Sequence, residues 1–328
     1  LRRACIEQGV PLLAFGGEMV PDAELASAST VPADVVGRAF EYLARGGLAN
    51  LEHVLRFVAD RLLGTSFGFA PPEDVPAWGI WGEPVLESTR PTVGVVFYRA
   101  HVLSGNTQFV DDLCAGLQHA GANALPVFCY SLRPDEQGVV PALEALAEHG
   151  VDAVVTTVLA MGTADGDEWS APQLAALDVP VVQAVASTRP AAEWAESDAG
   201  LTPMDAAMSV AIPEFDGRVI TVPFSFKEVV DDGDELGAPV VAYRTVPDRV
   251  ARVAGVAVRL AGLGWLPHVE KRVAIVLSAY PTKRSRLGNA VGLDTPASVI
   301  ELLHALRRSG YRVEHIPPDG DALMAELA

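Results

Sequence analysis

One apolar pattern occurs twice in this chain, and it restricts the chain to an alternating α/β fold. Residues 93–97 (Val-Gly-Val-Val-Phe) and 273–277 (Val-Ala-Ile-Val-Leu) each have the continuous apolar run of a buried strand. Each run leads through a polar loop to a helix-like segment, and a glycine lies four residues beyond the last leucine of that segment. Ligands of α/β sheets bind beside the loops at the carboxyl ends of the strands. The loops at 99–106 and 279–294 are therefore the first positions at which function is expected.

Further apolar runs alternate with helix-like segments between the two copies. Five such runs separated by helices predict the α/β class, with doubly wound parallel-sheet lobes. Strands are expected at 12–15, 93–97, 125–128, 153–158, 179–185, 218–222 and 273–277. Helices are expected at 32–45, 48–63, 110–117, 140–149, 171–177, 203–210, 247–263 and 299–306, and an acidic loop at 227–237.

Composition shifts along the chain suggest a multi-lobed organisation. Five prolines between residues 68 and 91 preclude a regular helix there and mark a boundary. Both ends look cut within helix-like segments, so we expect a fragment of a larger protein. The predicted divisions are the C-terminal part of an N-terminal α/β unit (1–67), a proline-rich linker (68–91), a doubly wound α/β lobe (92–246), a connecting helix (247–270) and the start of a second α/β lobe (271–328).

Charge and cysteine content narrow the classes of partner. The 328 residues carry a formal net charge of −18, which disfavours nucleic acids and anionic membrane surfaces. Three cysteines without a C-x-x-C pair indicate a reducing compartment, and we expect a cytoplasmic protein. No apolar run is long enough to predict a membrane span.

Several nucleotide, hydrolase and metal motifs are missing from the sequence. There is no G-x-x-x-x-G-K-[ST] loop and no G-x-G-x-x-G after a strand, which excludes a P-loop ATPase site and weakens a dinucleotide site. Neither G-x-S-x-G nor H-E-x-x-H occurs, and the seven histidines show no zinc-ligand spacing.

The first loop offers His101, Ser104 and Asn106. The Ser-Gly-Asn turn suits an anion at a helix N-terminus, although ordinary capping of the helix by Asn106 or Thr107 is the commoner role of such residues. His101 is a candidate metal ligand or proton acceptor, with a polar loop residue as the alternative.

The second loop holds three cations in a strongly acidic chain, followed by a helix-start signal at Asp294-Thr295-Pro296. Cations beside a helix N-terminus suit carboxylates or phosphates, whereas a solvated loop is the alternative. The candidate binding residues of this loop are Tyr280, Lys283, Arg284, Arg286 and Asn289.

Two carboxylates, Glu214 and Asp216, stand one residue apart before an expected strand. Such a pair suits general-base or metal chemistry. The Asp-Gly step that follows also suits a plain turn, so both interpretations stay open.

Four segments together resemble one family. They are 95–107 (VVFYRAHVLSGNT), 125–132 (LPVFCYSL), 213–217 (PEFDG) and 288–298 (GNAVGLDTPAS). They resemble the large subunits of aerobic cobaltochelatase (CobN) and the related H subunits of magnesium chelatase. The last segment is long and unusual, and the resemblance runs over nearly the whole chain.

This resemblance implies an N-terminal portion of a large tetrapyrrole-binding subunit. It implies a metal chelatase, a ligase that forms nitrogen–metal bonds, with Co²⁺ inserted into hydrogenobyrinic acid a,c-diamide in cobalamin biosynthesis. Mg-ATP would be hydrolysed by separate AAA+ partner subunits, in agreement with the missing P-loop, and this fragment alone would be inactive. A magnesium chelatase H-type subunit, a two-lobed small-molecule binding module without catalysis, and a scaffold for the AAA+ subunits are the alternatives.

The resemblance implies that the core chemistry involves later parts of the subunit, so the roles of the candidate residues here are a hypothesis from the chemistry of the implied substrate. Lys283, Arg284 and Arg286 would hold peripheral carboxylates of the macrocycle. His101, Glu214 and Asp216 would handle protons or the metal, and no metal ligand is assigned. The remaining substrate-binding candidates are Ser104, Asn106, Tyr280 and Asn289.

Overall fold

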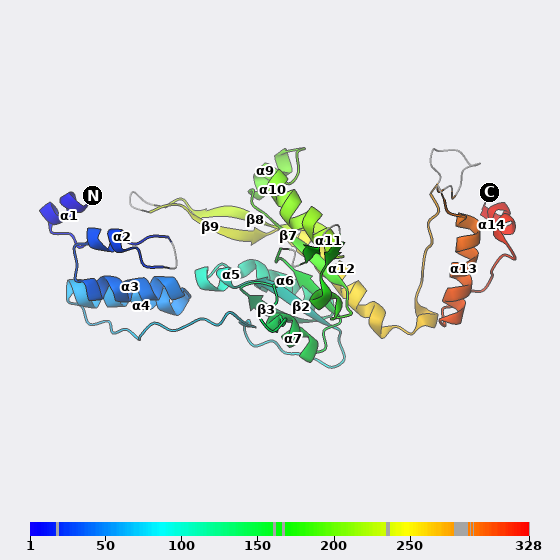
Figure 1. Ribbon diagram of the computed structural model, residues 1–328, viewed down its shortest axis with the longest axis horizontal. Coiled ribbons are helices and arrows are strands. Elements are labelled where there is room, and N and C mark those ends of the chain that lie inside the picture. The colour runs from blue at the N-terminus through cyan, green and yellow to red at the C-terminus, as the bar shows by residue number, and fades with distance from the viewer. Residues whose placement is uncertain are drawn as a thin grey trace. The chain divides into compact units, whose positions relative to one another are not determined.

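The computed structural model contains two compact units, Leu1–Ala261 and Gly262–Ala328 (Figure 1). The first unit contains helices and strands, and the described elements of the second unit are helical. The seven-stranded sheet of the first unit confirms the predicted α/β class. The finer divisions at 67, 91, 246 and 270 stay predictions. The structure describes residues 1–17, 20–159, 162–165, 168–233, 237–278, 288, 290 and 292–327.

The sheet of the first unit has a parallel centre and antiparallel edges. Its order is β1-β3-β2-β4-β7-β8-β9, in which the five inner strands run parallel and β1 and β9 run antiparallel to their neighbours. A separate antiparallel pair consists of β5 (Thr163–Asp165) and β6 (Glu168–Ser170). The strands of the main sheet are β1 (Trp78–Ile80), β2 (Thr92–Tyr98), β3 (Asn123–Cys129), β4 (Ala153–Thr156), β7 (Val181–Ser187), β8 (Val219–Asp231) and β9 (Val240–Thr245).

Helices cover the sheet and make up most of the other regular structure of the chain. Within the described ranges, no helix combines the length and apolar character needed to span a bilayer. Among the described residues, η1 (Ala59–Leu63) and η2 (Ala207–Ala211) are short π-helical segments, and η3 (His268–Glu270) is a 3-10 helix. The α-helices are α1 (Arg2–Gln8), α2 (Ala23–Ala28), α3 (Ala33–Arg45), α4 (Leu48–Val58), α5 (Arg99–Ser104), α6 (Gln108–His119), α7 (Pro141–Glu148), α8 (Pro172–Ala175), α9 (Ala191–Glu196), α10 (Pro203–Ala206), α11 (Ile212–Phe215), α12 (Pro247–Trp265), α13 (Thr295–Arg308) and α14 (Gly320–Leu327).

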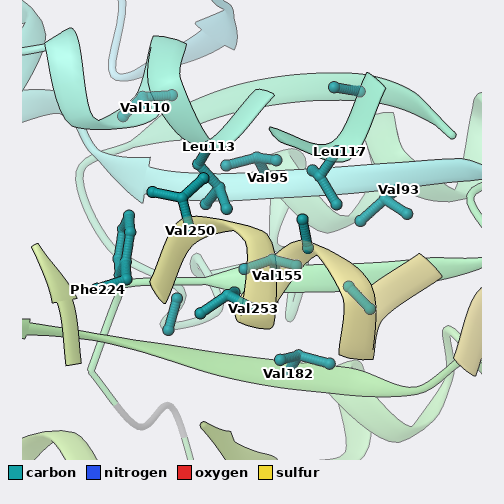
Figure 2. Packing of buried hydrophobic residues seen from close by; sticks show 14 of the residues in the cluster. Val93, Val95, Val110, Leu113, Leu117, Val155, Val182, Phe224, Val250 and Val253 are labelled. Carbon is teal, nitrogen blue, oxygen red and sulfur yellow. The ribbon is translucent and has the colours of Figure 1, made fainter. Parts of the chain in front are cut away.

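Both faces of the parallel strands are packed. On one face, α6 and α12 contribute Leu113 and Val253 to a core that contains the strand residues Val95 and Val155 (Figure 2). On the other face, α7 and α8 pack against alternate residues of the same strands, such as Val96. Strands buried on both faces have continuous apolar sequences, which is why the sequence predicts them.

The predicted strands of the first unit correspond to β2, β3, β4, β7 and β8, but β8 is longer than predicted. Beyond Phe226 it no longer pairs with β7 and continues with β9 as a two-stranded ribbon to Asp231 (Figure 1). The prediction of a loop throughout 227–237 was therefore wrong for 227–231. Acidic residues obscured the strand signal, because a solvated ribbon does not require apolar alternation.

Three local predictions were also wrong. The segment at 99–104 is the helix α5, while 12–15 and 273–277 lack strand pairing among the described residues. Residues 99–104 are compatible with either state, and contacts to the N-terminal helices favour the helix: Gly47 N donates to Leu103 O at 3.0 Å. A strand, by contrast, requires a partner for its backbone groups, and an apolar run alone does not supply one.

The proline-rich segment packs closely along the first unit. Arg99 donates from Nε to Pro76 O at 2.7 Å and from Nη2 to Val75 O at 2.6 Å. Asn50 holds the same segment on both sides, because its amide donates to Glu73 O at 2.7 Å and its Oδ1 accepts from Glu73 N at 2.9 Å. These contacts fix a segment that has little regular structure of its own.

The second unit is built around α13. Asp294 caps this helix as the sequence predicts, with Oδ1 accepting from Ala297 N at 3.1 Å. Val299 and Ile300 of α13 form a small core with Leu323 of α14, and Leu277 packs against it.

Candidate functional site

The topological switch point of the parallel sheet, where the strand order reverses, lies at the carboxyl end of β2. The chain passes from β2 to β3 on one side and then to β4 on the other side, so β2 lies between them. Ligands bind in α/β proteins where the strand order reverses in this way. The element that follows β2 directly is α5, which carries His101, and a tight turn then leads into α6.

His101 lies among aromatic side chains. Its ring centroid is 4.7 Å from that of Phe109 on α6 and 5.7 Å from that of Tyr243 on β9, both in edge-on geometry. Burial lowers the pKa of the His101 imidazole from 6.5 to about 4. Near neutral pH the ring is therefore uncharged, and one of its nitrogens carries a free electron pair. We call His101, Asn106, Phe109 and Tyr243 the edge cluster.

Asn106 ties the turn to β9. Its Oδ1 accepts from Tyr243 N at 3.0 Å. The N-cap residue of α6 is Thr107, but no side chain donates or accepts a capping hydrogen bond there, so the expected capping by Asn106 or Thr107 was wrong. The side chain of Asn106 instead replaces a missing backbone partner of an edge strand that is distant in sequence.

The turn itself is closed internally. Asn106 N donates to His101 O at 2.9 Å, Gly105 N donates to Val102 O at 3.3 Å, and Ser104 Oγ donates to Ala100 O at 2.9 Å. The two amides of the proposed anion turn thus already have acceptors in this conformation. Binding of substrate by Ser104 and Asn106 stays a prediction.

Two functional candidates, Tyr243 and Asp205, were missed in the sequence. Tyr243 belongs to β9, whose short apolar run at 240–243 was not recognised as a strand, and burial together with the nearby Asp205 carboxylate raises its pKa. Asp205 is buried and accepts from Thr188 N at 3.0 Å and Thr188 Oγ1 at 2.9 Å, just after β7. The sequence Thr202-x-x-Asp205 has the capping-box form, which indicates a helix start but contains no signal for proximity to Tyr243.

Asp216 belongs to a separate set of hydrogen bonds. Its Oδ2 accepts from Arg218 Nη2 at 2.6 Å, and neither side chain has exposed surface. Its Oδ1 accepts from Gly162 N at 3.0 Å and from Trp169 Nε1 at 2.8 Å. Asp216 itself precedes β8, but Gly162 follows the carboxyl end of β4, so the carboxylate joins the start of β8 to the chain that leaves β4.

Arg218 completes the same interaction. Its Nη1 donates to Val158 O and to Gln183 Oε1, each at 2.7 Å, and Nη2 also donates to Leu159 O at 3.1 Å. Burial lowers the pKa of Arg218, and the adjacent Asp216 opposes that effect. The pair therefore clamps the segment after β4 onto the sheet.

The other predicted residues divide into two groups. Glu214 is exposed on α11, two residues before Asp216, and its role stays a prediction. The loop candidates lie outside the described residues, and their roles stay predictions: Tyr280, Lys283, Arg284, Arg286 and Asn289.

No set of three or more His, Cys, Asp or Glu side chains is arranged to hold a metal ion in the described part of the chain. Burial raises the pKa of the Cys114 and Cys129 thiols to about 12, so both behave as small apolar side chains. His101 is therefore not part of a preformed multidentate centre within these ranges.

Comparison with known proteins gives a consistent result over the whole chain. The family model described as CobN/Magnesium Chelatase matches residues 40–328. The chain is similar to the aerobic cobaltochelatase subunit CobN of Pseudomonas aeruginosa (35% identity over 99% of this chain and 27% of the relative) and of a Sinorhizobium species (34%, 100% and 27%). It is also similar to the H subunit of magnesium chelatase from Rhodobacter capsulatus (28% identity, 84% of this chain and 25% of the relative).

A solved structure shares the same fold. The catalytic subunit of cobaltochelatase from Mycobacterium tuberculosis superposes with a TM-score of 0.86 at 46% identity, over 99% of this chain and 28% of that chain. This chain thus spans roughly a quarter of the length of the cobaltochelatase subunits it resembles.

The buried clamp generates a stability prediction. Asp216→Ala should lower the free energy of unfolding by about 3–5 kcal/mol, because it leaves the Arg218 charge buried without its partner. Asp216→Ala/Arg218→Met should cost less than the single change, since no uncompensated charge then remains. Urea denaturation measures both, and Glu52→Ala, which breaks the exposed Glu52–Arg56 pair, should cost at most about 1 kcal/mol. A double variant less stable than Asp216→Ala would contradict the clamp.

The environment of His101 generates a pH prediction. Its folded pKa of about 4 lies below the unfolded value of about 6.5, so the unfolded state binds the proton more readily and stability falls as pH drops from 6.5 to 4. His101→Phe should make the melting temperature fall less steeply over that window, with a comparison at pH 8 giving the packing difference alone. Parallel curves for the two proteins would show that the imidazole is not held neutral.

Proposed function

Because the chain belongs to the CobN/magnesium chelatase family, we propose that it forms part of the large, tetrapyrrole-binding subunit of an ATP-dependent cobaltochelatase. The reaction proposed is insertion of Co²⁺ into hydrogenobyrinic acid a,c-diamide during cobalamin biosynthesis, in the cytoplasm. ATP would be hydrolysed on AAA+ partner subunits. The observation that carries the cobalt assignment is that the cobaltochelatase relatives reach 34–46% identity over essentially the whole chain, against 28% over 84% for the magnesium relative.

Metal insertion requires that the macrocycle is held while its nitrogens exchange protons for the metal. Catalysis follows only from interactions that are stronger in the transition state than in the ground state. A group that binds Co²⁺ weakly beside the macrocycle meets this requirement, because it delivers the metal without retaining it. Imidazole nitrogen is a suitable ligand for cobalt.

His101 is our candidate for that transient contact. Its neutral ring keeps a nitrogen electron pair free, and the rings of Phe109 and Tyr243 restrict its orientation. Burial disfavours a positive charge at this ring, so it would hold a proton or Co²⁺ only weakly, which suits a transient contact. Glu214 and Asp216 receive no part in this proposal, since one is exposed elsewhere and the other is bound to Arg218.

Peripheral carboxylates of the macrocycle would be bound by Lys283, Arg284 and Arg286. Arginine binds a carboxylate through two parallel hydrogen bonds, and three cations in one loop of an acidic chain match a ligand with several carboxylates. Tyr280 and Asn289 of the same loop supply further donors. The proposal depends on the chemistry of these residue types.

The first experiment measures macrocycle affinity in the full-length subunit. Lys283→Ala/Arg286→Ala should weaken binding of the corrinoid substrate by at least about tenfold, since each charge-assisted hydrogen bond contributes about 1.5–3 kcal/mol. Arg2→Ala/Arg3→Ala removes the same charge from exposed positions on α1 and should leave affinity unchanged. Equal affinity of the loop variant and the unmodified subunit would contradict carboxylate binding. Stronger binding of a magnesium-chelatase porphyrin than of the corrinoid would favour the H-type alternative.

The second experiment separates metal handling from macrocycle binding. In the complete chelatase, His101→Gln should lower the rate of Co²⁺ insertion while the KM for the macrocycle stays the same, because the imidazole is assigned to the metal alone. His119→Gln, at the exposed carboxyl end of α6, is the matched control. An unchanged insertion rate, or a loss confined to macrocycle affinity, would contradict the role of His101.

A further inference from the structure

The second unit contains two segments without assigned helix or strand on either side of α13 in the sequence. They are residues 271–277, before the loop and α13, and residues 311–316, after α13. In the first segment, Val273 and Ile275 line a cavity beside α13 and are 56% and 37% exposed, whereas Val276 is 88% exposed. Alternate residues that face one space fit a β-strand whose inner face is still uncovered.

Both segments line one cavity. Its volume is about 380 Å³, and its wall on the α13 side consists of Leu303 and Leu306. The remaining wall residues come from both segments, so each segment borders the same space. They are Lys271, Val273 and Ile275 on one side and Tyr311, Arg312, Val313 and Glu314 on the other.

The backbone around this cavity is incompletely paired. No acceptor within the described ranges receives the amide N–H groups of residues 272–277 or 312–316. Arg307 holds the second segment extended, because its Nη2 donates to Val313 O at 2.8 Å and its Nε donates to the same oxygen at 3.1 Å. Amides that have no protein acceptor within the described ranges can serve as a template edge for another strand.

A β-strand is the occupant that fits both features. Its backbone would pair with the amides that now lack acceptors, and alternate apolar side chains would cover Leu303 and Leu306. A helix or a small apolar ligand would fill the space but leave the backbone donors unpaired. The backbone donors therefore favour a β-strand over a helix or a small apolar ligand as the occupant.

We propose that a β-strand from a part of the same polypeptide outside these 328 residues inserts between residues 271–277 and 311–316. The two segments and α13 then form a strand–helix–strand unit with parallel strands separated by one strand position. The cobaltochelatase relatives are long enough to provide such a strand, because this chain spans only 27–28% of their length. The inference is independent of the proposed function.

Hydrogen exchange in the full-length protein tests the insertion. Amides of both segments should exchange at least about 100-fold more slowly in the full-length protein than in the 328-residue chain, since ladder hydrogen bonds protect them. The protection should not depend on protein concentration. Unprotected segments in the full-length protein would overturn the proposal, and protection that rises with concentration would assign the site to a second copy.

Disulfide formation distinguishes insertion from direct pairing of the two segments. In a full-length background with Cys5, Cys114 and Cys129 changed to Ala, cysteines are placed at 274 or 276 and at 312 or 314. An inserted strand puts the segments about 9.6 Å apart, which is too far for a disulfide. Formation of a disulfide in any of the four pairs would overturn the proposal. Val229→Cys/Val241→Cys, on exposed register partners of β8 and β9, should form one and serves as the positive control.

Discussion

Each central strand of the sheet depends on partners from two directions. β2 is hydrogen-bonded to β3 on one side and β4 on the other, while α6 with α12 and α7 with α8 cover its two faces. Burial of apolar surface on both faces supplies the main stabilising free energy of such a layer. The backbone groups inside it avoid the cost of desolvation because the ladder pairs them. The helices α3 and α4 of the same unit enclose a separate apolar core that contains Val35, Tyr42 and Phe57.

The edge cluster follows from that arrangement. A strand that ends in the middle of a covered sheet must release its chain at the carboxyl edge, and here the released chain forms α5 immediately. The short helix presents His101 to Phe109 and Tyr243, and Asn106 fixes β9 to the same turn. An imidazole held neutral in this position fits transient contact with a divalent metal better than strong base chemistry. Family membership supports the chelatase part of the proposal, and the local geometry supports the choice of His101.

The Asp216–Arg218 pair shows why two carboxylates one residue apart need not share a function. Glu214 is exposed, whereas Asp216 has no exposed surface and accepts three hydrogen bonds. A buried ion pair contributes little net stability compared with apolar packing, but the loss of one partner is costly. In this protein the Asp216–Arg218 pair fixes the segment after β4 to the start of β8. In the second unit, the segments beside α13 present the opposite situation, because their amides have no protein acceptor among the described residues.

The sequence by itself determined the α/β class, the positions of the central strands, the cap of α13 and the family. These depend on local patterns: strands buried on both faces need continuous apolar runs, and Asp294 caps through an amide three residues away. The tertiary structure alone decided that 99–104 is helical, that 273–277 lacks a ladder, and that β1 and β9 form the edges. It also decided that Tyr243 and Asp205 lie near one another while Asp216 belongs to a clamp. Such pairings join residues far apart in sequence, and no local pattern of side chains encodes which distant backbone or charge will be the partner.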